Sequence, residues 1–263
     1  MLRHLIWAAL ASVAWACGNS AEDAPARRGP GEAADGPALE GRVLVSAAAS
    51  LRDAFGEIER AFESAHPRVD VVLNLGSSST LRAQILEGAP VDVFASANVA
   101  NMDQVVAAGA VPGEPRIFAR NLLVIAVPKG NPAGVRGLQD FAREELLLGL
   151  CAEEVPCGAF ARQALARAGV VPAIDTNEPD VRALLTRVEL GELDAGITYI
   201  TDVVSSRGRV EGIEIPEEHN VVAEYPIAVL ADAPNPEAAA AFVAFVLSRE
   251  GQAILRKHGF AAP

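Results

Sequence analysis

From Arg42 onward the chain alternates short apolar runs with segments whose apolar residues recur every three or four positions. Residues 69–75 (VDVVLNL) are typical of a strand, because β-branched and apolar residues fill a short run. Residues 51–65 are typical of a helix, since Leu51 and Ile58 would share one apolar face. A chain that repeats this order is predicted to form an α/β fold with mostly parallel sheets flanked by helices.

The predicted elements form two groups of similar size. The first group holds strands at 43–46, 69–75 and 91–95 and helices at 51–65, 81–87 and 98–108. The second holds strands at 146–150 and 195–199 and helices at 159–168 and 181–190. Two apolar strands, 121–127 and 221–230, would connect the groups, and the helical residues 236–258 would return to the first. We therefore expect two lobes with a ligand cleft between them: lobe 1 from 41–121 and 228–263, and lobe 2 from 122–227, including crossing strands.

Composition narrows the class of protein and of partner. The 263 residues are 51% hydrophobic and 21% charged, which is typical of a globular chain with a substantial core. Lys and Arg number 22 against 34 Asp and Glu, so the net charge of −12 argues against nucleic acid as a partner. The 4 His and 3 Cys show no spacing typical of metal ligands.

Residues 1–17 have the pattern of an export signal. A short basic start precedes the apolar run 5–16, which is too short to span a membrane as a helix. Residues 14–17 (AWAC) fit a small-x-small cleavage site and also resemble a lipoprotein box, in which Cys17 would be acylated. We favour lipidation of Cys17, followed by a flexible tether at 18–40 that is rich in Gly, Pro and charge.

Four predicted loop-to-helix junctions share one chemical character. Each offers unpaired backbone N–H groups at the positive end of a helix. The junctions are residues 47–50, 76–80, 155–158 and 179–181. In a doubly wound fold they lie at the carboxyl ends of strands, where such sheets bind ligands. If several face one cleft, they would bind an anion without a cationic side chain.

Two alternatives compete with an anion site. Ser50 precedes a helix with an acidic third residue, so it also fits an ordinary N-cap. The run 77–80 holds more hydroxyls than a cap needs, which favours a ligand. An enzyme would use one of these serines as a nucleophile, but no histidine belongs to a triad pattern and no Gly-x-Ser-x-Gly occurs. We therefore expect no enzymatic activity.

Several motifs in order resemble the periplasmic molybdate-binding proteins of ABC-type molybdate importers, a family of type II periplasmic binding proteins. The motifs are residues 47–51 (AAASL), 76–81 (GSSSTL), 88–94 (GAPVDVF), 155–158 (VPCG), 180–182 (DVR) and 196–199 (GITY). The likeness runs from about Val43 to Phe260. It implies a two-lobed type II periplasmic-binding-protein fold.

The resemblance also implies a function and a set of ligand-binding residues. A tetrahedral oxyanion, molybdate or tungstate, would bind between the lobes without a cofactor, and molybdenum would enter only as molybdate. The donors would be the hydroxyls and amides of Ser50 and Ser78, the backbone N–H groups of Cys157 and Val181, and the hydroxyl of Tyr199. The exported protein, expected to be a monomer, would deliver the anion to an ABC-type permease and its ATPase.

The chemistry of the ligand supports these expectations. A buried dianion loses its hydration, so each oxygen needs a donor. Donors spaced for molybdate would reach the smaller sulfate poorly, but they would not distinguish molybdate from tungstate. Sulfate or phosphate remains the alternative ligand. Cys151 and Cys157 could form a disulfide that braces the ligand loop, or could remain two buried thiols; we favour the disulfide.

Overall fold

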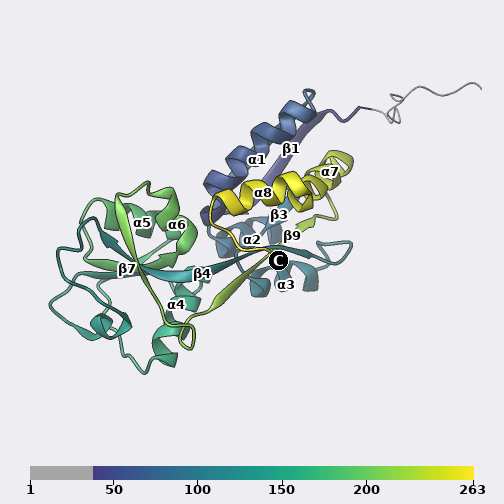
Figure 1. Cartoon of the computed structure of the whole chain (residues 1–263). Helices are drawn as coiled ribbons and strands as arrows, with labels where there is room; N and C mark the ends of the chain where they lie inside the picture. The colour runs from purple at the N-terminus through teal and green to yellow at the C-terminus, as the bar shows by residue number, and fades with distance from the viewer. Residues whose placement is uncertain (1–37) are drawn as a thin grey trace, which may run out of the picture. The chain divides into compact units, whose positions relative to one another are not determined.

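Strand β4 (Arg116–Pro128) is shared by two β-sheets and sets the layout of the fold (Figure 1). The computed structural model describes residues 38–263. Residues 116–122 of β4 pair with β9 (Val222–Val229) in the first sheet. Residues 123–128 pair with β7 (Ala195–Tyr199) and β8 (Val210–Glu214) in the second. One continuous backbone segment therefore belongs to both halves of the fold.

The first sheet has the strand order β2-β1-β3-β9-β4. Its parallel part consists of β1 (Gly41–Ala48), β2 (Val69–Gly76) and β3 (Val93–Ala95), with Val45 opposite Leu73. Parallel neighbours need crossover connections, and helices supply them. β9 pairs antiparallel with both β3 and β4.

The second sheet repeats this arrangement with fewer residues. β5 (Leu148–Cys151) is parallel to β6 (Thr176–Glu178) and to β7. β4 runs antiparallel to β7 and β8. In each sheet the parallel strands therefore lie to one side of the strands that cross between the sheets.

Helices connect these strands. They are η1 (Ala49–Leu51), α1 (Arg52–Ala65), α2 (Ser78–Leu86), α3 (Val99–Ala107), η2 (Leu138–Ala142), α4 (Pro156–Arg167), α5 (Val181–Glu189), α6 (Ile200–Ser205), α7 (Pro236–Leu247) and α8 (Arg249–Lys257). Within residues 38–263 no single helix has the length and hydropathy of a membrane span. Helices α7 and α8 together would meet those criteria, but they are bent by 60° at their junction.

The C-terminal helices return to the first sheet, as expected from the sequence. Both contact α1, and α7 also contacts β1 and β9. Buried aromatic rings fill this contact: the ring of Phe62 lies 5.4 Å from that of Phe242, and the ring of Phe55 lies 5.7 Å from that of Phe118. The apolar residues that predicted helices in the sequence are the ones that form this core.

The expected α/β fold is confirmed, with crossing strands that add antiparallel pairs to otherwise parallel sheets. The lobe boundary expected at residue 227 stays a prediction. Strand β9 pairs along its length with β3 and with the first part of β4, so its pairing is in the first sheet. The short elements β6, β8 and α6 were not predicted, because a few residues are too short a run to establish a period.

Candidate functional site

A small pocket lies where four helix starts and the end of β7 converge. All five residues that the sequence singled out line it: Ser50, Ser78, Cys157, Val181 and Tyr199. The other lining residues are Ala48, Ala49, Gly76, Ser77, Ala97, Val155, Pro156 and Asp180. The cavity volume is about 20 Å³, somewhat more than the roughly 10–15 Å³ that one water needs on this measure. The pocket therefore suits a ligand of few atoms.

The adjacent serines at the start of α2 have different roles. Ser77 is the N-cap, and its Oγ accepts a hydrogen bond from the N–H of Thr80 at 3.1 Å. The Oγ of Ser78 accepts from the N–H of Ala97 at 2.9 Å. Since an acceptor site of Ser78 is already filled, its own proton is free to point into the pocket.

The side chain of Ser50 contacts the hydroxyl of a tyrosine on β9. Its Oγ lies 3.0 Å from the hydroxyl oxygen of Tyr225, which is on β9. Ser50 is in η1 rather than at a cap: the residue that precedes η1 is Ala48, and the α1 N-cap is Leu51. The N-cap alternative for Ser50 is therefore wrong, because no side chain of this segment caps either helix start.

Helix α4 begins without a side-chain cap. Pro156 at its first position has no N–H, so the first free donor of the helix is the N–H of Cys157. A Cβ on Gly158 would lie 1.9 Å from the carbonyl oxygen of Ala152, so only glycine fits this turn. A disulfide joins Cys157 to Cys151 at the end of β5, with their Cα atoms 5.8 Å apart. The bridge ties the start of the helix to the sheet.

Helix α5 has a side-chain cap, but this cap does not bond the first N–H group of the helix. The Oδ1 of Asp180 accepts from the N–H groups of Arg182 at 2.8 Å and of Ala183 at 3.0 Å. This cap does not use the N–H of Val181, which is the first helical residue. Asp180 is a lining residue, and its carboxylate is oriented by these two hydrogen bonds to its own helix.

The hydroxyl of Tyr199 is the least satisfied group in the pocket. Tyr199 is 1% exposed, and within residues 38–263 its hydroxyl makes no hydrogen bond of standard geometry, although the Tyr225 hydroxyl lies close enough to interact with it. Burial raises the pKa of this hydroxyl well above its usual value, so it remains a donor at physiological pH. A buried donor without a partner is costly, and a bound acceptor would relieve that cost.

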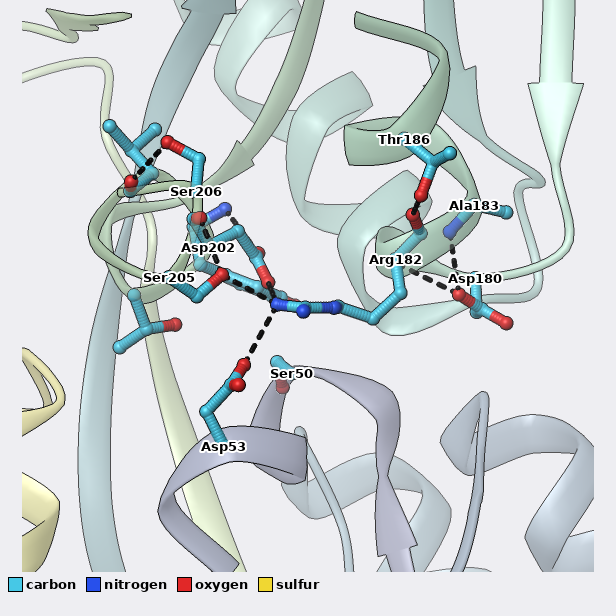
Figure 2. A network of polar contacts seen from close by, with 12 residues as sticks. Ser50, Asp53, Asp180, Arg182, Ala183, Thr186, Asp202, Ser205 and Ser206 are labelled. Atoms are coloured by element: carbon cyan, nitrogen blue, oxygen red, sulfur yellow. Dashed lines mark hydrogen bonds and ion pairs between the residues drawn. The ribbon is translucent and has the colours of Figure 1, made fainter. Parts of the chain in front are cut away.

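Arg182 lies beside the pocket but does not line it (Figure 2). Its Nη1 donates to Ser205 Oγ at 2.6 Å and lies 3.1 Å from Asp53 Oδ2 on α1. The fully buried Asp202 is 4.0 Å away. Burial raises the pKa of Asp202 to about 7, while the N–H of Tyr199 and the charge of Arg182 oppose the shift. The guanidinium is therefore engaged by carboxylates, and among the described lining residues no Lys, Arg or His reaches the cavity.

The residues behind the pocket could not be recognised from the sequence. Tyr225 looked like one more aromatic residue of an apolar strand, and Asp53 like an ordinary acidic residue of a first helical turn. Only Arg182 carried a signal, since it directly follows a predicted ligand residue. Cys17, the signal at 1–17 and most of the tether at 18–40 lie outside the described residues.

Two α/β sheets that share strand β4, with a small donor-lined pocket where their helix starts meet, define a two-lobed solute-binding protein of the periplasmic type. Residues 43–261 match the family model described as bacterial extracellular solute-binding protein. This chain belongs to that family.

Similarity to individual proteins points the same way. The chain is 38% identical over 260 residues to the molybdate-binding protein ModA of Mycobacterium tuberculosis, covering 98% of this chain and 97% of that one. It shares the fold of the periplasmic molybdate-binding protein of Azotobacter vinelandii, with a TM-score of 0.74 at 19% identity, covering 84% of this chain and 99% of that one. The sulfate-binding protein SubI of Mycobacterium tuberculosis shares the fold, with a TM-score of 0.76 at 18% identity and coverage of 85% and 87%.

Proposed function

We propose that this protein captures molybdate, and also tungstate, in the pocket between its two sheets and delivers the anion to an ABC importer. The observation that carries the proposal is the convergence of donors. The donors are the hydroxyls of Ser50, Ser78 and Tyr199 and the backbone N–H groups of Cys157 and Val181. Relatives named molybdate-binding proteins at up to 38% identity support the choice of ligand.

The hydrogen bonds behind the pocket favour a fully deprotonated anion. The Ser78 oxygen already accepts from Ala97, and the Tyr199 hydroxyl is kept protonated by burial. Such groups donate to an oxyanion, whereas an O–H on a protonated anion would find few acceptors. Phosphate, which is partly protonated at neutral pH, is therefore disfavoured relative to molybdate.

Binding without catalysis is the second part of the proposal. Ser50 contacts a tyrosine hydroxyl, and Ser78 contacts a backbone N–H. Neither contact is to a general base that could take up the serine proton, as a nucleophilic serine requires. The family, too, is one of solute-binding proteins.

The third part concerns location and partners. An export signal at 1–17 and membership of an extracellular family support export to the periplasm or cell envelope. We propose that Cys17 is acylated and anchors the protein through the tether at 18–40, so that a monomer delivers its ligand to a permease and ATPase. The lobes would close about the two connecting segments, β4 and the chain that leads into β9.

Calorimetry on the purified protein tests this function with molybdate, tungstate, sulfate and phosphate. We expect comparable tight binding of the first two and much weaker binding of the others. A matched pair of variants tests the site. Ser78→Ala should weaken molybdate binding by about tenfold or more, whereas Ser79→Ala should not, because the Ser79 hydroxyl contacts Ser77 and does not line the pocket. Sulfate binding as tight as molybdate binding would overturn the ligand assignment.

A further inference from the structure

Behind Ser50 lies a chain of buried polar side chains that leads from the pocket into the crossing strands. Tyr225 on β9 is 0% exposed, Asn121 on β4 is 2% exposed, and Thr201 on α6 is 4% exposed. Buried polar groups of this kind are costly unless each finds a partner. The contacts of these side chains with one another therefore bear on which way the proton between Ser50 and Tyr225 points.

The side-chain amide of Asn121 is the first group in this chain of hydrogen bonds. Its Oδ1 accepts a hydrogen bond from the N–H of Leu122 at 3.0 Å. This contact distinguishes the amide oxygen from the amide nitrogen, Nδ2, which carries the protons. This Nδ2 donates to Thr201 Oγ1 at 2.8 Å and to the hydroxyl oxygen of Tyr225 at 3.4 Å. The Tyr225 oxygen is thus an acceptor, and its own proton is available for Ser50 Oγ at 3.0 Å.

We propose that Tyr225, oriented by Asn121, is a positioning residue that makes Ser50 a donor toward the bound anion. Tyr225 fills an acceptor site of Ser50, so the serine proton turns into the pocket. In the opposite arrangement Ser50 would donate to Tyr225 and present its lone pairs to a dianion. This inference rests on the proposed function, because it assigns the donor that the anion meets at Ser50.

Packing holds Tyr225 in place independently of its hydroxyl. Its ring lies 5.4 Å from that of Phe260 and 6.2 Å from those of Phe118 and Tyr199. Burial raises the pKa of its hydroxyl, which therefore keeps the proton that it donates. Because the ring carries the packing, Tyr225→Phe removes the hydrogen bonds with little change in shape.

A double-mutant cycle tests the inference, with molybdate affinity measured by calorimetry on Tyr225→Phe, Ser50→Ala and the double variant. We expect Tyr225→Phe to weaken binding about tenfold, which corresponds to about 1.4 kcal/mol. In the Ser50→Ala background the same change should alter affinity less than about twofold, because Tyr225 acts through Ser50. A purely structural role of Tyr225 would weaken binding equally in both backgrounds and would overturn the inference.

Two further comparisons distinguish a failure of the proposed site from a failure of the positioning role of Tyr225. Combined with Ser78→Ala, which lies on a different part of the pocket, Tyr225→Phe should keep its full effect. If Ser50→Ala binds molybdate normally, the proposed site fails at Ser50. If Ser50→Ala weakens binding and Tyr225→Phe does not, only the positioning role fails. If thermal unfolding shows that Tyr225→Phe is not folded, Asn121→Ala takes its place in the cycle. Its effect on molybdate affinity should depend on Ser50 in the same way.

Discussion

At the scale of single residues, the donors that the pocket offers depend on which side-chain atoms already make hydrogen bonds within the protein. Ser77 and Ser78 are neighbours of the same type, yet one caps a helix and the other faces the cavity. The sequence predicted Ser78 and Tyr199 through a family resemblance, since the residue type alone suits a cap or a core strand. It could not predict Tyr225, because nothing local distinguishes a tyrosine with a buried hydrogen bond from one that only packs.

Tyr199→Phe should change stability and binding in opposite directions. The Tyr199 hydroxyl is buried and makes no hydrogen bond of standard geometry among residues 38–263. Removing it should raise the free energy of unfolding by about 1 kcal/mol, while molybdate affinity falls because a donor is lost. Urea unfolding and calorimetry on the same preparation measure both. A variant that is both less stable and weaker in binding would show that the hydroxyl has another partner.

Asp202→Asn should change how stability depends on pH. The folded pKa of about 7 lies above the roughly 3.9 of an unfolded aspartate, so the native state holds an extra proton between these values. Stability from this group is therefore present at low pH and is lost as pH rises through about 7. The variant lacks this loss, so its free energy of unfolding relative to wild type should be higher at pH 8 than at pH 5. The exposed Asp232→Asn is the control, and it should show the same difference at both pH values.

At the scale of elements, the start of each helix decides what the pocket offers. Helix α5 uses Asp180 for two N–H groups and leaves Val181, whereas α4 has no side-chain cap and relies on Pro156 and the disulfide. The sequence predicted strand β7 with its bounds as observed, because 195–199 is a clear apolar run. The strand predicted at 121–127 is shorter than β4, because the first residues of β4 include Arg116 and Arg120 and are not typical of a buried strand. Those charges are tolerated because Arg116 is exposed and Arg120 pairs with Glu224 on β9.

The disulfide should matter more for stability than for binding. Replacing Cys151 and Cys157 together with alanine should lower the free energy of unfolding by about 2 kcal/mol, the chain-entropy estimate for a short loop. Molybdate affinity should change less than about threefold, since the donor at residue 157 is a backbone N–H that alanine retains. Reductant should destabilise the wild type and leave the double variant unaffected. Equal sensitivity of both proteins to reductant would contradict the bridge.

At the scale of the whole molecule, net charge does not predict the ligand. The chain carries −12, yet the proposed ligand is an anion held by neutral donors. The excess of acid describes the surface, whereas the pocket is defined by helix starts brought together from distant parts of the sequence. The α/β topology alone suggested that several helix starts could face one cleft, and the resemblance of several motifs in order to one family specified which residues would meet there.

The ion pair between Asp53 and Arg182 should favour the conformation in which the two lobes are closed on the ligand. Asp53 is on α1, which packs on β2 of the first sheet, and Arg182 is on α5, which packs on β7 of the second. Asp53→Asn should weaken molybdate binding about twofold to fivefold, the range for a partly exposed pair, and less so at high salt. Asp70→Asn removes an exposed pair with Arg42 on neighbouring strands of the first sheet. It should leave affinity unchanged, and an equal effect of the two variants would contradict a specific role for Asp53.

The most direct measurement is diffraction at the molybdenum absorption edge from crystals grown with molybdate. Anomalous scattering locates the metal without relying on the shape of the electron density. We predict one strong peak in the pocket, with oxygens within hydrogen-bond distance of the Ser50, Ser78 and Tyr199 hydroxyls and of the N–H groups of Cys157 and Val181. An empty pocket at saturating molybdate, or a peak at another site, would contradict the account.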